Sequence, residues 1–293
     1  MPTDVRTIAV IGAGQMGGGI AQVAATAGIN AIAYDAFPAS LDKCKALHAK
    51  LMARAVEKGK MSQSDADAAL KRITYTSDFD AITKADWVVE AAVEDAALKA
   101  ELFQKLARTF TNPRVVLATN TSSISITQIA AAAEAAAPGA GSRVIGMHFF
   151  NPVPVMKLVE VIRGLTTTDE VTQRTIDLSI AMGKEPHAAN DRAGFVSNRV
   201  LMPMINEAFY AWMEGVAEPE DIDAIMMKGC AHPMGPLRLA DFIGLDTCVH
   251  IMDVLADGLN NDRYRACPKL KQLVTAGRLG NKTNRGVYDY ANK

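Results

Sequence analysis

Two residues suited to acid–base chemistry, His148 and Glu160, lie in two apolar runs on either side of a short turn sequence. The runs cover residues 143–149 (RVIGMHF) and 155–162 (VMKLVEVI), and the segment between them, Asn151-Pro-Val-Pro154, has two prolines with restricted φ angles. If the runs pair as a β-hairpin centred near Pro154, His148 falls opposite Glu160. Directly opposed residues in a sheet have Cβ atoms about 5 Å apart, so an imidazole–carboxylate hydrogen bond is within reach.

A histidine with such a partner can act as a general base toward an alcohol. The carboxylate fixes the tautomer of the imidazole and stabilises its protonated form. An isolated histidine in an apolar strand is more often a hydrogen-bonded core residue. However, a carboxylate in the neighbouring apolar run also needs a partner. The pattern therefore favours an acid–base pair formed by His148 and Glu160.

A glycine-rich turn near the N-terminus predicts a dinucleotide site. It follows an apolar strand at 6–11 and opens a helix at 15–28. Its glycines permit a tight turn, close approach of a pyrophosphate and close packing of the helix, whose first amides attract anions. Asp35 ends a second strand at 31–35, where a carboxylate accepts hydrogen bonds from ribose and repels a 2′-phosphate. We therefore expect NAD as the cofactor, bound by Gly12, Gly14, Gln15, Met16, Gly17 and Asp35; the alternative is a structural turn with an incidental aspartate.

The remaining elements predict how these groups are held. Further strands are expected at 73–76, 86–92 and 114–119, with helices near 38–58, from 62, at 95–110 and at 125–137. This alternation predicts βαβ units and a mostly parallel, doubly wound sheet covered on both faces. After about residue 190 only helical patterns follow, at 195–214, 218–229 and 236–257. The fold class is therefore α/β, with a smaller all-α C-terminal domain.

The composition is that of an ordinary globular protein. The chain has 293 residues, 49% hydrophobic and 22% charged, so it is long enough for two domains. A net charge of −1 gives no general attraction to nucleic acid or to an anionic membrane, and neither is expected as a partner. The N-terminus does not read as a signal peptide, and no apolar stretch is long enough for a membrane span. The four cysteines lack CxxC spacing, which favours reduced thiols in the cytoplasm, and no metal site is expected.

Several motifs together resemble those of the 3-hydroxyacyl-CoA dehydrogenases, including the bacterial 3-hydroxybutyryl-CoA dehydrogenases. They are HFFNPVPVMKLVEVI at 148–162, ATNTSS at 118–123, GFVSNR at 194–199 and GNKTNRGVYDY at 280–290. The resemblance covers essentially the whole chain. It implies a Rossmann-type NAD-binding domain at 1–189, a helical domain at 190–293 that forms a homodimer, and an active site at the cleft between them. The implied reaction is NAD-dependent oxidation of the 3-hydroxyl of a short acyl-CoA, or reduction of the 3-keto compound.

The same resemblance implies roles for single residues. His148 and Glu160 are the base and its orienting acid, and Ser122 and Asn198 bind the substrate oxygens. Glu94 and Asn120 lie near the nicotinamide, while Lys99 and Lys282 are cofactor-side lysines. From the residues alone, Ser122 and Ser123 can equally cap the next helix, and the pattern around Asn198 favours a surface amide that contacts only water.

A cationic stripe on the long helix could receive the phosphates of CoA. Lys50, Arg54 and Lys58 are spaced four residues apart and so share one helix face. Lys58 best matches a CoA-binding position of the family. The alternative is a solvated helix end, since positive charge is favoured there by the helix dipole.

Three other functions fit parts of the pattern. The 6-phosphogluconate and 3-hydroxyisobutyrate dehydrogenases share the glycine loop, but they use a lysine, and the His148–Glu160 hairpin argues against them. A sugar-acid dehydrogenase of the same superfamily would not need the basic stripe. A non-catalytic dinucleotide-binding protein would hold His148 too far from the nicotinamide to act. The resemblance to short-chain bacterial enzymes favours acetoacetyl-CoA as substrate.

Overall fold

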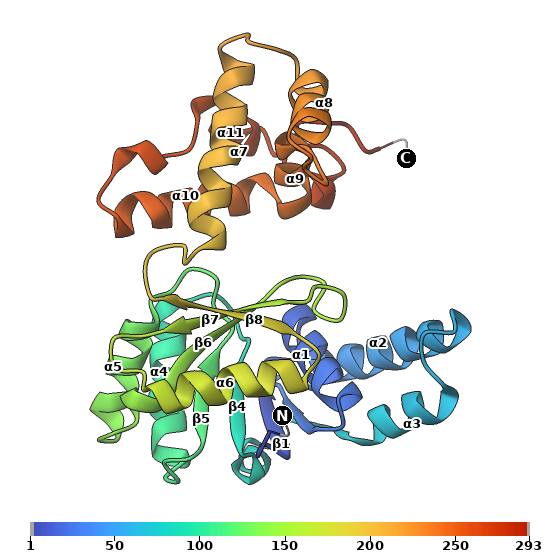
Figure 1. Ribbon diagram of the computed structural model, residues 1–293, viewed down its shortest axis with the longest axis vertical. Helices are drawn as coiled ribbons and strands as arrows, with labels where there is room; N and C mark the ends of the chain where they lie inside the picture. Colours follow the sequence, from blue (N-terminus) through green and yellow to red (C-terminus); the bar gives the residue numbers. More distant parts are fainter. Residues whose placement is uncertain (1–2, 292–293) are drawn as a thin grey trace. The chain divides into compact units, whose positions relative to one another are not determined.

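The computed structural model describes residues 3–291 and shows two compact units. The first unit ends at Asp191, and the second begins at Arg192. Figure 1 traces the chain from the first unit, in blue to yellow, to the second, in orange to red. None of the helices between residues 3 and 291 combines the length and apolar character needed to cross a membrane.

The first unit is built on one eight-stranded sheet with the order β3-β2-β1-β4-β5-β6-β7-β8. All neighbouring strands are parallel except β6 and β7, which form an antiparallel pair. The predicted doubly wound, mostly parallel sheet is therefore confirmed. The strands are β1 Thr7–Ile11, β2 Asn30–Tyr34, β3 Ile73–Thr76, β4 Trp87–Glu90, β5 Val116–Thr119, β6 Val144–Phe149, β7 Leu158–Arg163 and β8 Glu185–Asn190.

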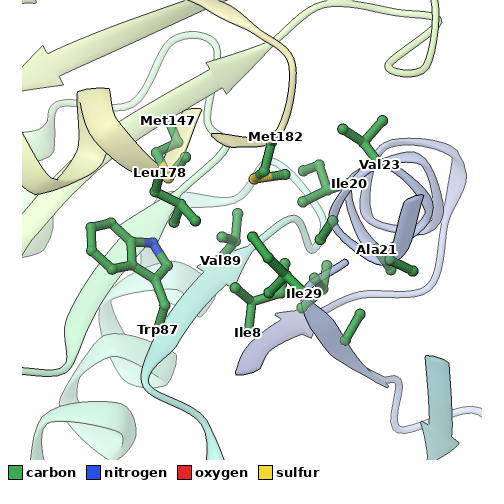
Figure 2. Close-up of a cluster of buried hydrophobic side chains, with 14 of the residues drawn as sticks. Ile8, Ile20, Ala21, Val23, Ile29, Trp87, Val89, Met147, Leu178 and Met182 are labelled. Carbon is green, nitrogen blue, oxygen red and sulfur yellow. The ribbon is translucent and has the colours of Figure 1, made fainter. Parts of the chain in front are cut away.

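Helices cover both faces of this sheet (Figure 1). They are α1 Gln15–Thr26, α2 Pro38–Glu57, α3 Gln63–Lys71, α4 Ala96–Thr109, α5 Ile126–Ala136 and α6 Asp169–Ala181. Helices α1, α3 and α6 contribute to one continuous core with the strands, in which Ile20, Trp87, Val89 and Leu178 are 0% exposed (Figure 2). Burial on both faces explains why these strands read as unbroken apolar runs rather than as alternating patterns.

Helix α6 and strand β8 were not predicted. Strand β8 has the sequence EPHAAN, and all six of its residues are at least partly exposed. It lies at the edge of the sheet, where charged residues and proline are tolerated. Because an edge strand needs no apolar run, its sequence carries little signal of its own.

Between residues 192 and 291, the second unit consists of helices apart from short 3-10 segments and two isolated bridges, Gly280↔Arg285 and Arg285↔Asp289. The helices are α7 Ser197–Met213, α8 Pro219–Gly229, α9 Pro236–Ile243, α10 Leu245–Gly258 and α11 Pro268–Thr275. The prediction of a single helix at 236–257 is wrong, because the chain forms two helices there, α9 and α10. At the break Gly244 has a φ of 104°, a conformation that favours glycine and ends a helix. The unit has its own core, which includes Phe209 and Leu255 at 0% exposure.

Candidate active site

The antiparallel pair β6–β7 brings His148 and Glu160 together. The two residues are direct register partners, as the hairpin pattern predicted, and His148 Nδ1 lies 2.7 Å from Glu160 Oε2. Their neighbours Met147 and Val159 point into the core with α1 and α6, so His148 and Glu160 lie on the opposite face of the sheet. The side chains are only 10% and 5% exposed. With a carboxylate at Nδ1, that nitrogen carries the hydrogen, and Nε2 is left as the basic atom.

The strand carrying His148 is also held from β5. Asn120, which follows β5, accepts a hydrogen bond at Oδ1 from the backbone amide of Phe149, at 2.9 Å. The ring of Phe150 lies 4.6 Å from the imidazole of His148, measured between centroids. Asn120 therefore fixes the backbone directly after the histidine.

The glycine loop has the geometry expected of a pyrophosphate site. Gly12 has a φ of +99°, and a Cβ there would meet the carbonyl oxygen of Ala91 at 2.5 Å. A Cβ on Gly17 would lie 1.8 Å from the Gly12 oxygen. By contrast, apart from Gly14 itself and its two chain neighbours, no heavy atom of residues 3–291 lies within 4 Å of the Cβ position of Gly14, which precedes α1. Two glycines are thus required by packing, while the third leaves the helix N-terminus open to a ligand.

Asp35 lies beside this loop. Its Oδ2 accepts a hydrogen bond from the Ala13 amide at 2.8 Å, and its Oδ1 accepts one from the Phe37 amide at 2.9 Å. Each carboxylate oxygen keeps a lone pair for a ribose hydroxyl. From the same loop, Gln15 Nε2 donates to Asn151 Oδ1 at 3.0 Å, which joins the loop to the turn between β6 and β7.

Glu94 organises the loop that follows β5. Its Oε1 accepts hydrogen bonds from Thr121 Oγ1 at 2.6 Å, from the Ser122 amide at 2.9 Å and from Ser123 Oγ at 3.0 Å. Burial alone would raise the pKa of Glu94, but the charge of Lys99 and these hydrogen bonds lower it below its usual value. The expectation that Ser122 or Ser123 caps the next helix is wrong, because Ser125 is the N-cap of α5.

Lys99 lies behind Glu94 and is 1% exposed. Its Nζ is 2.6 Å from Glu90 Oε1 and 3.4 Å from Glu94 Oε2. Glu90 is fully buried and also accepts from Thr119 Oγ1 at 2.6 Å. Sequence reasoning missed Glu90, although a carboxylate ending the apolar strand WVVE signalled that a buried partner was needed. The three charged groups tie the ends of β4 and β5 to α4.

The other predicted site residues lie farther along the chain or on the surface. Lys50, Arg54 and Lys58 are exposed near the C-terminal end of α2. In the second unit, Asn198 is in the first turn of α7 and is 8% exposed. Lys282 forms an ion pair of 2.6 Å with the carboxylate of Asp246.

A glycine loop on the first strand, an aspartate after the second, and a buried His–Glu pair define a dinucleotide-binding α/β protein of the dehydrogenase class. The family model for the NAD binding domain of 3-hydroxyacyl-CoA dehydrogenase matches residues 7–192, and the model for its C-terminal domain matches residues 194–290. The chain belongs to the 3-hydroxyacyl-CoA dehydrogenase family.

Individual relatives agree with this assignment over their full length. The chain is 50% identical to a probable 3-hydroxybutyryl-CoA dehydrogenase of Bacillus subtilis, an alignment that covers 99% of each chain. It is 45% identical to a 3-hydroxybutyryl-CoA dehydrogenase of Bradyrhizobium diazoefficiens, over 99% of this chain and 97% of the relative. The crystal structure of (S)-3-hydroxybutyryl-CoA dehydrogenase PaaH1 from Ralstonia eutropha superposes with a TM-score of 0.94 at 44% identity, covering 99% of this chain and 100% of that one.

Proposed function

We propose that this protein is an NAD-dependent dehydrogenase that interconverts (S)-3-hydroxybutyryl-CoA and acetoacetyl-CoA. The observation that carries the proposal is the buried His148–Glu160 pair on the sheet that also bears the glycine loop. Family membership supplies the reaction, and the pair supplies the acid–base group that the reaction needs.

The residues present fit NAD. The open side of Gly14 and the free end of α1 would receive the pyrophosphate, and Asp35 would hold the adenosine ribose. Gly12, Gln15, Met16 and Gly17 complete the loop. We further propose that Glu94, Lys99, Asn120 and Lys282 belong to the cofactor side of the site, with Lys99 acting through the Glu94 carboxylate. When bound, NAD would supply the acceptor for the hydride from C3 of the substrate, and NADH would supply the hydride for the reverse reaction.

Side chains of the protein accept and donate the proton of the 3-hydroxyl. In the oxidative direction His148 Nε2 accepts the proton of the 3-hydroxyl, and Glu160 stabilises the imidazolium that forms. In the reductive direction the imidazolium gives that proton back to the 3-oxygen. Ser122 and Asn198 are proposed to hydrogen-bond the oxygen while its charge changes. Glu94 Oε1 accepts hydrogen bonds from the Ser122 amide at 2.9 Å and from the Ser122 hydroxyl at 3.3 Å, so this side chain is oriented before substrate binds.

The CoA moiety, the assembly state and the cellular location belong to the same proposal. Lys50, Arg54 and Lys58 present an exposed positive stripe suited to the CoA phosphates. A homodimer through the second unit is supported by large apolar side chains exposed there, namely Val216, Ile225, Met227 and Phe242. Four cysteines without disulfide bonds favour the cytoplasm.

The test is an absorbance assay of NADH consumption with acetoacetyl-CoA, run in parallel with free acetoacetate and with NADPH. We expect rapid turnover only with the CoA ester, and a strong preference for NADH. Comparable rates with acetoacetate would favour the sugar-acid dehydrogenase alternative, in which CoA is not recognised. NADH binding without turnover of any 3-keto compound would favour a non-catalytic protein.

A further inference from the structure

Lys184, directly before β8, is a buried lysine that the mechanism above does not use. It is 7% exposed, and its Nζ donates to the carbonyl oxygens of Val153 and of Met156, the latter at 2.8 Å. Its position is itself fixed, since its amide donates to the Ser179 oxygen at 2.9 Å. Burial lowers the pKa of Lys184. A buried ammonium held by two main-chain carbonyls is costly, so it indicates that the segment it holds must be placed accurately.

That segment, residues 151–156, is the turn between His148 on β6 and Glu160 on β7. It also contacts helix α1, which follows the glycine loop. A Cβ on Gly19 of α1 would lie 2.7 Å from Val153 Cβ, so the helix backbone rests on this side chain. Val153 is 2% exposed and belongs to the core that contains α1. The turn is thus held between Lys184 on one side and α1 on the other.

Two parts of the proposed reaction meet at this turn. Helix α1 begins at the loop expected to bind the pyrophosphate, and the turn joins the two strands that carry the acid–base pair. We propose that Lys184 and Gly19 are positioning residues that set the spacing between the bound dinucleotide and the His148–Glu160 pair. The inference rests on the proposed dehydrogenase function. Reacting atoms must approach to about 3–3.5 Å, and a displacement of about 1 Å can cost about 100-fold in rate.

The first variant is Lys184→Met, which keeps an unbranched side chain but removes the charge and the donors. We expect kcat to fall by about tenfold or more. The primary isotope effect on kcat with 3-deuterated 3-hydroxybutyryl-CoA should rise, because hydride transfer becomes slower relative to product release. A merely structural lysine would lower the melting temperature or the amount of folded protein, but would leave the isotope effect of the folded enzyme unchanged. Lys157→Met is the matched control: Lys157 is exposed, pairs with Glu185 at 3.0 Å, and should leave kcat unchanged.

A second variant changes the contact between the turn and α1, and it tests the proposal if Lys184→Met does not fold. Gly19→Ala places a methyl group against Val153 and should also lower kcat and raise the isotope effect. Adding Val153→Ala relieves the contact and should restore part of the rate. If the wild type does not turn over acetoacetyl-CoA, the proposed function fails. If the wild type is active while Lys184→Met, or Gly19→Ala in its place, keeps both kcat and the isotope effect, the positioning role is overturned.

Discussion

Replacing Glu160 by glutamine isolates the electrostatic part of the proposed mechanism. Glutamine keeps the size of the side chain and a hydrogen-bond acceptor for Nδ1, but it removes the charge that lies 2.7 Å from the imidazole. Unit charges about 4 Å apart interact by about 4 kcal/mol at an effective dielectric constant of about 20. The imidazolium forms as the alcohol proton is transferred, so this attraction lowers the barrier rather than the ground state. Since the amide retains part of the interaction, we expect a loss of about 3 kcal/mol, or roughly 100-fold in kcat.

The assay is the initial rate of NAD reduction with saturating (S)-3-hydroxybutyryl-CoA, together with NADH affinity from nucleotide fluorescence. NADH affinity should be unchanged, because Glu160 is not part of the glycine loop. Glu185→Gln removes a carboxylate from the neighbouring strand β8, where the side chain is 63% exposed, and should stay within about twofold of the wild type. If Glu160→Gln keeps a third or more of the wild-type kcat, Glu160 does not stabilise the imidazolium.

Three further predictions test other parts of the site. Lys58→Ala should raise the KM for acetoacetyl-CoA several-fold (about 1 kcal/mol) with little change in that for NADH, and equal effects on both would count against a CoA contact. Asp35→Ser should weaken NADH binding and lower the ratio of kcat/KM for NADH to kcat/KM for NADPH. The carboxylate accepts a hydrogen bond from the Ala13 amide and would repel a 2′-phosphate, and serine lacks this charge. An unchanged ratio would contradict this prediction. The pKa of Glu94 is lower in the folded protein than its usual 4.5, so its stabilisation is present above that pH and is lost as pH falls toward the folded pKa. Thermal unfolding should therefore show a deficit of Glu94→Gln that is full at pH 6 and shrinks below about pH 4.5, and a pH-independent deficit would refute it.

The hairpin pair and the glycine loop could be predicted because both depend on residues close together in sequence. A short turn with two prolines sets the register of β6 and β7, and that register alone places His148 opposite Glu160. The glycine pattern specifies its own backbone geometry, which Gly12 and Gly17 adopt here. Such signals require no knowledge of the tertiary structure.

Contacts made across the sheet could not be predicted in the same way. Glu90, Lys99 and Thr119 meet because β4, α4 and β5 pack together, and no local spacing identifies which face of α4 is buried. Lys184 contacts the turn from a segment for which the sequence predicted neither a helix nor a strand. Strand β8 is recognised through its pairing with β7 rather than through its polar sequence.

The most direct test of the central claim is a single-turnover measurement on His148→Gln with NADH and acetoacetyl-CoA. Glutamine preserves polarity and approximate size, but it cannot donate and accept a proton as an imidazole does. We predict that the rate of NADH oxidation falls by about 10²- to 10⁴-fold while the affinity for NADH stays at the wild-type value. A rate within a few-fold of the wild type would show that His148 is not the acid–base residue, and the proposed mechanism would be wrong.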